Sequence, residues 1–363
     1  MYNKCEIKFH KSEGISVKDV IQKFLDRAVE DKVFPGCTCA IVSLEGVKYY
    51  CSGKKSVYPN EEKNSIDTIY DLASLTKVIC TTTIILKLIQ EKKITYYTKV
   101  SEILLDFQNE NICIYHLLTH TSGLPADLGW DFHISKEQIY KDIYHYSNRP
   151  LTLGDINYSD IGFMLLGEII EKITNKSLDK AFLEYVVYPL DMKNTMYCPR
   201  KDIQEYIAPT EVCHYTGELL KGIVHDRKAR CCHNVAGHAG VFSNVEDLVN
   251  YVKMILHKGF FNHKQYLDSQ YIDDMAKCWV ETDGLKRGIG YLINSDKGIF
   301  SKMNSVSTIV HTGFSGTSLL IDIEKHIGII LLSNRIHPSR DNTKILEWRK
   351  LFHEYVMDNL SVK

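Results

Sequence analysis

The sequence predicts an α/β (α+β) protein in which both ends of the chain build one antiparallel sheet and the middle folds as a mostly helical insertion. Segments of β character occur near both ends, whereas the periodicity between them is mostly helical. We therefore expect residues 1–66 and 282–363 to form an α/β sheet lobe flanked by helices. Residues 67–281 would form the helical lobe, with any active site at the interface between the two.

Each end of the chain combines strands with one helix. Helical spacing covers Val17–Lys32, and GCTCAIVSL and VKYYCSG, joined through Glu45-Gly46, predict a β-hairpin. Near the other end, RGIGYLIN, STIVH, TSLLID and HIGIILLSN have β character, and Lys344–Met357 predicts a closing helix. The middle carries three amphipathic helical patterns: Leu75–Gln90, Ile161–Ile173 and Val245–Leu256.

Length and charge limit the classes of partner. The chain has 363 residues, enough for a large core and two lobes. Hydrophobic residues make up 44% and charged residues 25%, and the formal net charge is -1. This charge predicts no general attraction to nucleic acid or to an anionic membrane, so the small-molecule or peptide-like substrate that we expect has to be argued from a site. The oligomeric state stays open.

A lysine inside the first helical pattern is the first candidate for chemistry. Lys77 is the one charged side chain between Leu72 and Leu86, and it follows Ser74 by three residues. Residues three apart on a helix are neighbours. Burial lowers the pKa of a lysine, so Lys77 could act as a base beside a nucleophilic Ser74. The plain alternative is a helix cap next to an ordinary lysine.

Two further stretches follow in the order that a serine-hydrolase site would need. INYSDIGFMLLGEII places Tyr158-Ser159-Asp160 just before an amphipathic helix, and IVHTGFSGTSLLID places His311-Thr312-Gly313 at the end of a β segment. Taken alone, Tyr158 could be a hydrophobic staple and His311 an ordinary polar residue at a strand end. Their occurrence together with Ser-x-x-Lys favours a catalytic interpretation.

The three motifs together resemble those of the penicillin-recognising serine hydrolases: class C β-lactamases, D-alanyl-D-alanine carboxypeptidases, D-aminopeptidases and family VIII-type esterases. Those proteins combine Ser-x-x-Lys, Tyr-x-Asn and Lys/His-Thr-Gly. The resemblance runs through nearly the whole chain, including FPGCTCAIVS, YDLASLTKV, HLLTHTSGLP, GHAGVFSNVEDL and HTGFSGTSLLIDIEKHIGIILLSNR. It implies a β-lactamase/transpeptidase-like fold and hydrolysis of an amide or ester through an acyl-enzyme, without a cofactor.

The same resemblance assigns roles to residues. Ser74 would be the nucleophile, Lys77 its base or proton relay, and Tyr158 a second relay, with His311 on the HTG strand completing the catalytic set. The backbone N–H groups of Ser74 and Phe314 would form the oxyanion hole. The remaining residues expected to contact substrate are Asp160, His238, Thr312 and Gly313.

Two positions depart from the family pattern. Asp160 stands where asparagine is common; it could hold Lys77 protonated or select a substrate with a donor or cation. Alternatively, Asp160 or Ser159 merely caps the helix that begins at Ile161. His311 stands where lysine is common, and a neutral imidazole would hold a substrate carboxylate less firmly, which puts strong β-lactam binding in doubt.

A cysteine- and histidine-rich segment, RCCHNVAGHAGVF, suggests a metal site at first sight. Its spacing matches none of the usual zinc patterns, so we expect no metal there. The four residues concerned are Cys231, Cys232, His233 and His238. We expect HLLTHTSGLP to be structural, a helix end followed by a turn at Gly123 and Pro125.

The first 32 residues contain no apolar h-region, and no apolar run of about 18 residues is evident. With eleven scattered cysteines, an odd number, these features favour a cytoplasmic protein. Because YSD, HTG and GHAG segments also resemble a cytosolic amidase that recycles wall fragments, a muropeptide is the expected substrate. The alternatives are a carboxylesterase, a D-amino-acid amidase or D,D-peptidase, a weak β-lactamase, or a non-catalytic penicillin- or muropeptide-binding sensor.

Overall fold

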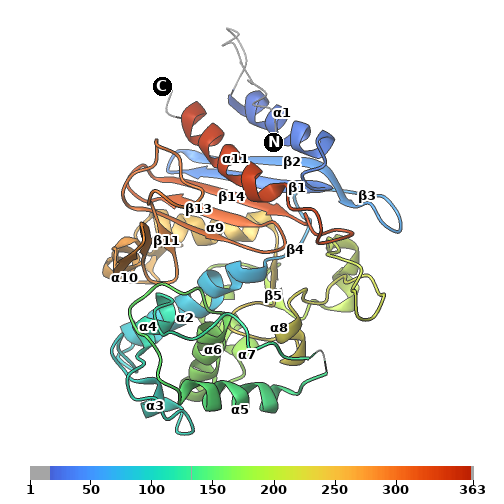
Figure 1. The fold of residues 1–363 in the computed structure, drawn as a ribbon. Helices are drawn as coiled ribbons and strands as arrows, with labels where there is room; N and C mark the ends of the chain where they lie inside the picture. The colour runs from blue at the N-terminus through green and yellow to red at the C-terminus, as the bar shows by residue number, and fades with distance from the viewer. Residues whose placement is uncertain (1–16, 132, 361–363) are drawn as a thin grey trace.

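The computed structural model describes residues 17–131 and 133–360, and one nine-stranded antiparallel sheet is its central element (Figure 1). The strand order is β3-β2-β1-β14-β13-β12-β11-β10-β9. The strands are β1 (Gly36–Ser43), β2 (Gly46–Ser56), β3 (Glu62–Lys63), β9 (Val280–Thr282), β10 (Leu285–Arg287), β11 (Leu292–Ile293), β12 (Thr308–Thr312), β13 (Ser318–Asp322) and β14 (Ile327–Ser333).

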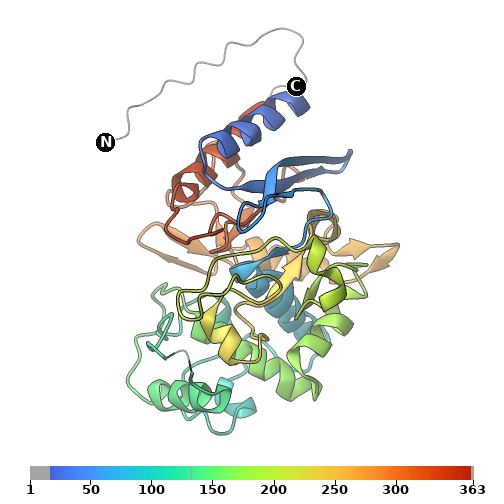
Figure 2. The same cartoon turned by 90° about the vertical axis from the view of Figure 1, so that its right-hand side faces the viewer.

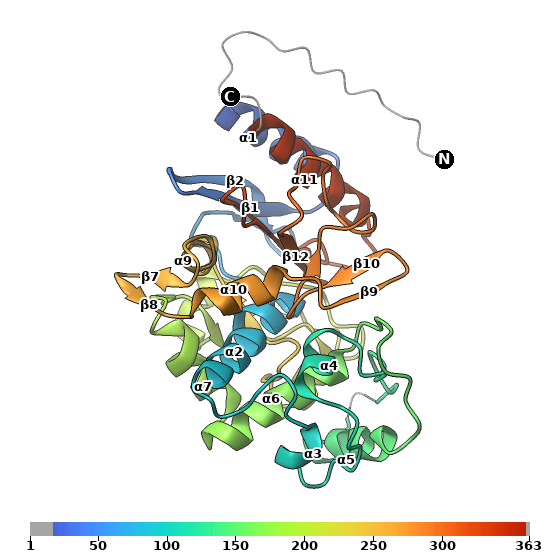
Figure 3. The same cartoon turned by 90° about the vertical axis from the view of Figure 1, so that its left-hand side faces the viewer.

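The two ends of the chain meet inside this sheet. Strand β1 pairs with β2 on one side and with the C-terminal β14 on the other, so that Ala40 lies opposite both Tyr49 and Ile330. The expected sheet from both chain ends is therefore confirmed. Helices α1 (Val17–Glu30) and α11 (Ile345–Leu360) lie side by side over one face of it (Figures 1 and 3).

The opposite face of the sheet is covered by α9 (Val245–Leu256), which packs against β1 and β14. This helix belongs to the stretch expected in the helical lobe, yet its apolar side faces the strands. Close packing explains the contact: a Cβ at Gly328 of β14 would lie 2.3 Å from Cγ1 of Val252. The sheet is thus a middle layer between α1 and α11 on one side and α9 on the other.

The helical region lies beyond α9, on the side of the sheet away from α1 and α11 (Figure 2). Its helices are α2 (Thr83–Gln90), α3 (Val100–Ile103), α4 (Ile114–Leu118), α5 (Lys136–Ser147), α6 (Asp160–Thr174), α7 (Leu178–Phe182), α8 (Arg227–Cys231), the π-helix η3 (Leu183–Val187) and the 3₁₀ helix η4 (Lys201–Tyr206). Helix α10 (Ser269–Ala276) instead packs beside the sheet, against β12. Two small sheets complete the fold: β4 (Tyr70–Asp71), β6 (Val241–Ser243) and β5 (Met196–Tyr197); and β7 (Phe260–Phe261) with β8 (Lys264–Gln265).

The helical pattern at Leu75–Gln90 does not form one regular helix. A 3₁₀ turn, η1 (Ala73–Leu75), and a π-helix, η2 (Lys77–Thr82), precede α2. By length and composition the run Ala73–Gln90 is apolar enough to cross a membrane, which corrects the expectation that no such run exists; 78% of it is buried inside the protein.

The segment RGIGYLIN, expected as one strand, is interrupted. Strand β10 ends at Arg287 and β11 begins at Leu292. Between them Gly290 has φ +81°, and a Cβ there would lie 2.5 Å from Oγ1 of Thr82 on η2. The bend lets the sheet edge approach η2, and it leaves Arg287 at a strand end.

We predict that Gly328→Ala lowers the free energy of unfolding by about 1–3 kcal/mol, because the added methyl group overpacks the contact with Val252. Val252→Ala removes the clashing Cγ1, so the double variant should be more stable than the sum of the two single losses. Urea denaturation of all four proteins measures this coupling. Strictly additive losses would contradict the packing.

Candidate active site

Ser74 lies on a strained turn at the start of the buried helical run. Its neighbour Ala73 has φ +47°, a conformation that side chains with a Cβ rarely adopt. The buried carboxylate of Asp71 holds this turn by accepting a hydrogen bond from the Ala73 N–H at 2.8 Å. The strain is thus fixed by a specific local contact, as is common at functional sites.

The loop after β12 packs directly on this turn. The Ser315 hydroxyl donates to the Asp71 carbonyl (2.7 Å), and the Thr317 hydroxyl donates to the Leu72 carbonyl (3.0 Å). Gly313 is required in this contact, because a Cβ there would lie 2.1 Å from Thr317 Oγ1 and 2.6 Å from the Leu72 carbonyl oxygen. The HTG segment and the Ser74 turn, far apart in sequence, therefore form one surface.

Lys77 is fully buried and surrounded by acceptors. Its Nζ lies 3.1 Å from Ser74 Oγ, 3.1 Å from the His238 carbonyl oxygen and 2.7 Å from Asp160 Oδ1. Burial alone would lower the pKa of Lys77, but the Asp160 carboxylate and the Tyr158 phenol raise it above its usual value. The expectation that burial leaves Lys77 with a low pKa is therefore wrong: the side chain is an ammonium at neutral pH.

Asp160 is the first residue of α6, and it does not cap the helix. Ser159 is the cap, since its hydroxyl accepts the Gly162 N–H at 3.0 Å. The other carboxylate oxygen of Asp160 lies 3.0 Å from Nζ of Lys228 on α8. Burial opposes ionisation, yet the nearby Lys77, His238 and Lys228 side chains lower the pKa of Asp160 to about 2. Asp160 thus bridges two lysines.

A contact between His238 and Asp226 lies next to the pair of Lys77 and Asp160. Asp226, the cap of α8, lies 2.8 Å from Nε2 of His238. The imidazole of His238 is buried, with 1% exposed, and faces Asp226, so the expected contact between this side chain and substrate does not fit its position. Its backbone carbonyl faces Lys77 instead. Gly237 permits this, because a Cβ there would lie 2.1 Å from the Phe163 carbonyl oxygen of α6.

Tyr158 lies between the charged and aromatic side chains of the site. Lys77 Nζ is 5.0 Å from the centroid of its ring, and a hydrogen bond to the phenol is among the causes that raise the pKa of Lys77. The ring of His120 lies 4.5 Å from the Tyr158 ring, and that of His311 lies 6.3 Å away. The guanidinium carbon of Arg287 is 5.8 Å from the same centroid. The structure therefore brings the Ser74, Lys77, Tyr158 and His311 motifs together.

His311 is neutral at pH 7. Burial and the positive charges of Lys77 and Arg287 hold its pKa well below its usual range. Its Nδ1 lies 3.1 Å from the Thr312 carbonyl oxygen, so Nδ1 carries the hydrogen and donates it. Nε2 then carries a free lone pair and has no hydrogen-bond partner. Phe314, half exposed, follows at the rim, with Arg335 Cζ 4.4 Å from its ring centroid.

Comparison with known proteins agrees with this arrangement. A family model described as Beta-lactamase matches residues 21–352. The chain belongs to the beta-lactamase family. N-acetylmuramyl-L-alanine amidase of Bacillus subtilis (strain 168) is 30% identical over 363 aligned positions, covering 86% of this chain and 80% of that protein.

A putative D-alanyl-D-alanine carboxypeptidase of Salmonella gallinarum is 31% identical over 318 positions, covering 77% of this chain and 72% of that protein. The crystal structure of a beta-lactamase/D-alanine carboxypeptidase from Pseudomonas syringae has a TM-score of 0.72 at 17% identity and covers 93% of this chain and 99% of that one. The β-lactamase/transpeptidase-like fold is thereby confirmed, and this beta-lactamase-family protein is a serine hydrolase.

Four residues of the beta-lactamase-family site were not found from the sequence: His120, Asp226, Lys228 and Arg287. His120 lies in HLLTHTSGLP, a segment expected to be structural, but its Nδ1 accepts the Ser159 N–H at 3.0 Å. Its φ of +60° is a sign of strain that the sequence does not reveal. Lys228 and Arg287 lie in segments without a motif. Only the folded chain brings Lys228 next to Asp160 and Arg287 next to Tyr158.

One group of potential metal ligands occurs among the described residues: Asp160, Asp226 and His238. Cys231, Cys232 and His233, for which the sequence predicts no metal site, are not part of this group. Nζ of Lys228 lies 3.0 Å from Asp160 Oδ2 and 3.8 Å from Asp226 Oδ2, so an ammonium already balances these carboxylates. The two carboxylates are therefore better suited to binding the Lys228 ammonium than a metal ion.

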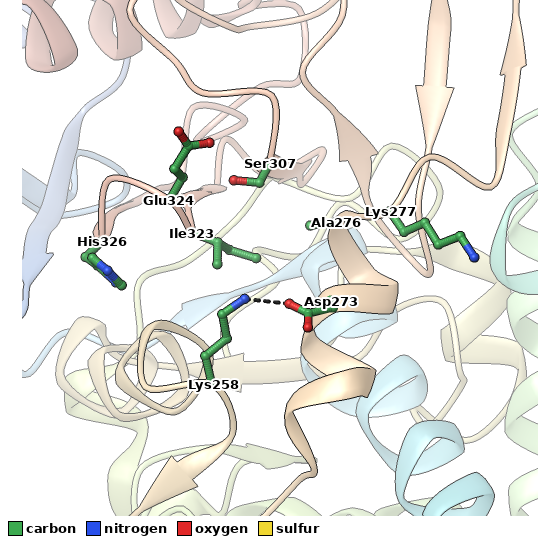
Figure 4. Close-up of a pocket in the computed structure, with 8 residues that line it drawn as sticks. All are labelled: Lys258, Asp273, Ala276, Lys277, Ser307, Ile323, Glu324 and His326. Atoms are coloured by element: carbon green, nitrogen blue, oxygen red, sulfur yellow. Dashed lines mark hydrogen bonds and ion pairs between the residues drawn. The ribbon is translucent and has the colours of Figure 1, made fainter.

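A separate hollow of about 460 Å³ lies away from the motifs of the beta-lactamase family (Figure 4). It is open to solvent, and an ion pair between Lys258 and Asp273 lies at its edge. The hollow shares no residue with the serine site. The lining residues are Lys258, Asp273, Ala276, Lys277, Ser307, Ile323, Glu324 and His326.

We predict that the stability difference between wild type and Asp160→Asn depends on pH. Because the folded-state pKa of Asp160, about 2, lies below its ordinary value of 3.8, the carboxylate contributes about 2 kcal/mol that is present above pH 4 and lost as the pH falls through 2. Urea denaturation at pH 5 and near pH 2 measures it. A difference that stays constant would show that the charge of Asp160 does not stabilise the fold.

Proposed function

We propose that this serine hydrolase cleaves an amide bond in a peptidoglycan-derived muramoyl-peptide through an acyl-enzyme at Ser74. The observation that carries the proposal is the buried Lys77 ammonium, 3.1 Å from Ser74 Oγ and hydrogen-bonded to Tyr158. The Bacillus subtilis relative supports the choice of substrate, because its name, N-acetylmuramyl-L-alanine amidase, describes this bond and the chain covers 80% of its length.

In the first step Ser74 Oγ attacks the amide carbonyl carbon, and its proton passes to the oxygen of Tyr158, which this step requires in the deprotonated form. Lys77 already donates its hydrogens to acceptors and is held as an ammonium by Asp160, so it has no lone pair for this proton. It acts instead as a fixed positive charge that favours negative charge on Tyr158 and on Ser74 Oγ.

In the second step the carbon–nitrogen bond breaks, and Tyr158 gives its proton to the leaving amine nitrogen. The acyl group remains on Ser74 Oγ. Water then attacks the ester carbon and gives one proton to Tyr158, which returns it to Ser74 Oγ as the acid product leaves. Every proton taken up is released, and no further reactant is needed.

Negative charge on the carbonyl oxygen would be stabilised by the backbone N–H groups of Ser74 and Phe314. The contact of Gly313 with the Leu72 carbonyl supports this pairing, because it brings the two backbone segments together. The free Nε2 lone pair of His311 offers an acceptor to a substrate N–H or hydroxyl group. A carboxylate is not a partner for this neutral imidazole.

Asp160 acts through Lys77 in this mechanism rather than through the substrate. Its two oxygens lie against two ammonium groups, and its side chain is only 16% exposed. The carboxylate therefore has no free oxygen directed at a ligand. Of the two functional interpretations of Asp160, holding Lys77 protonated fits the contacts better than selecting a substrate.

We predict that Ser74→Ala lowers kcat/KM by on the order of 10³ or more on a muramoyl-peptide, because the nucleophile is lost. A panel of muramoyl-peptides, D-amino-acid amides, β-lactams and short-chain esters, followed by mass spectrometry, tests activity and substrate class together. Turnover of D-amino-acid amides or esters but of no muramoyl-peptide would overturn the proposed substrate.

A fluorophosphonate probe separates an enzyme from a passive binder. The wild type should be labelled at Ser74, and Ser74→Ala should not be labelled. Ser159→Ala is the matched control: it removes a helix cap, which costs about 1 kcal/mol of stability, but leaves the nucleophile in place. Stoichiometric labelling without turnover on any substrate would favour a sensor over an amidase.

A further inference from the structure

An arginine on the C-terminal helix contacts the loop that joins β12 to β13. Arg349 of α11 is 6% exposed, and its Nη1 donates to the carbonyl oxygens of Gly313 (3.1 Å) and Thr317 (2.9 Å). Burial and the like charge of Arg335 lower the pKa of its guanidinium to about 10, so Arg349 is still a cation at pH 7. The described residues include no carboxylate that forms an ion pair with it. A buried charge without an opposite charge is costly, so its position requires a reason.

Closure of the loop does not supply that reason. The Gly313 carbonyl oxygen accepts the Gly316 N–H at 3.2 Å, and the Gly313 N–H donates to the Thr317 carbonyl oxygen at 2.8 Å. These two backbone bonds already form the tight turn between the strands. Arg349 therefore adds a second, charged donor to two carbonyl oxygens that each have a backbone partner.

The Gly313 carbonyl belongs to the same peptide unit as the Phe314 N–H. A hydrogen bond from a cation to the carbonyl oxygen polarises the unit, and its N–H becomes a stronger donor. In the proposed mechanism this N–H is one of the two donors to the substrate oxygen on which negative charge develops. Among the described residues the Phe314 N–H donates to no other backbone group, so it is available for that oxygen. Arg349 can thus act on the substrate through one peptide unit.

Arg335 is a second buried arginine on the same loop, and it contacts a different peptide unit. It is 4% exposed, and its Nε donates to the Phe314 carbonyl oxygen at 3.0 Å. That oxygen belongs to the following peptide unit, whose N–H group is that of Ser315. The two arginines therefore bring the same charge to the loop, but only Arg349 polarises the unit that carries the Phe314 N–H.

We propose that Arg349 is a positioning residue for catalysis: its guanidinium fixes and polarises the peptide unit between Gly313 and Phe314, and so strengthens the Phe314 N–H as a donor to the oxyanion. This inference rests on the proposed acyl-enzyme mechanism. It adds a residue of α11, outside the three motifs, to the groups that determine the rate. No bond-making or proton-transfer step is assigned to Arg349.

Two small probes test the inference, with all values normalised to the sites that a fluorophosphonate titrates. The first measurement is kcat/KM for p-nitrophenyl acetate. The second is the Kd of phenylboronic acid, whose tetrahedral adduct with Ser74 carries negative charge as the transition state does. For Arg349→Met we expect kcat/KM to fall about tenfold and Kd to rise by a similar factor, since one oxyanion donor is weakened but not removed.

Arg335→Met is the matched control, because it removes an equal charge from the same loop. Both of its values should stay within about threefold of the wild type, since the Phe314 N–H keeps its polarised unit. Equal losses in Arg335→Met and Arg349→Met would reduce the effect to the net charge near the site and overturn the inference. A loss of ester turnover in Arg349→Met without a loss of boronate affinity would overturn it as well.

Two further variants separate charge from hydrogen bonding, and they decide the question if Arg349→Met does not fold. Arg349→Gln keeps a neutral donor, whereas Arg349→Lys keeps a charged one. Because the charge polarises the peptide unit, Gln should lose about fivefold or more in both measurements and Lys less than about threefold. Thermal unfolding checks that each protein is folded. Equal losses in the two variants would contradict the role of the charge.

Failure of the proposed function is seen separately. If Ser74→Ala hydrolyses the ester as fast as the wild type, the acyl-enzyme and the role of Arg349 fall together. If Ser74 is required but no muramoyl-peptide is cleaved, only the proposed substrate fails. The ester and the boronate then still decide between Arg349 and Arg335, because neither probe depends on the identity of the natural substrate.

Discussion

The ion pair between Lys77 and Asp160 is the interaction on which the rest of the site depends. Lys77 is fully buried, and it comes from η2, whereas Asp160 begins α6. A buried pair of this kind contributes little net stability, but either charge alone would be strongly unfavourable. The pair therefore acts as a constraint on geometry: η2 and α6 can pack in one arrangement only, and that arrangement brings Tyr158 to Ser74.

The same pair determines which group can move a proton. An ammonium that is fixed by a carboxylate supplies charge but cannot accept a proton, so in the proposed mechanism Tyr158 transfers the protons. His311 is neutral for a related reason, since burial and the nearby positive charges lower its pKa, and its Nε2 has no hydrogen-bond partner. Each role follows from a protonation state, and each protonation state follows from burial combined with the nearest charges.

The sequence predicts those features that local pattern determines. Alternating and helical periodicity reveals the sheet from both chain ends, and the spacing of Ser74 and Lys77 places them side by side. Charge partners from other elements have no local signal, so the raised pKa of Lys77 follows only once Asp160 is in contact. The π-helix is equally hidden, because a helical pattern does not distinguish α from π turns. Arg287 was missed because it lies in an apolar strand segment without a motif.

The carboxylate of Asp160 lies between two buried lysines, Lys77 and Lys228. Each oxygen of the carboxylate forms an ion pair with one ammonium group, Lys77 at 2.7 Å and Lys228 at 3.0 Å. An asparagine amide has one oxygen, and its NH₂ group would face the second lysine, donor against donor. Lys228 also contacts Asp127 at 3.0 Å, which connects α8 to the loop before α5. The aspartate that departs from the family pattern is thus required by a second buried lysine, so the departure reflects charge pairing inside the protein rather than contact with a ligand.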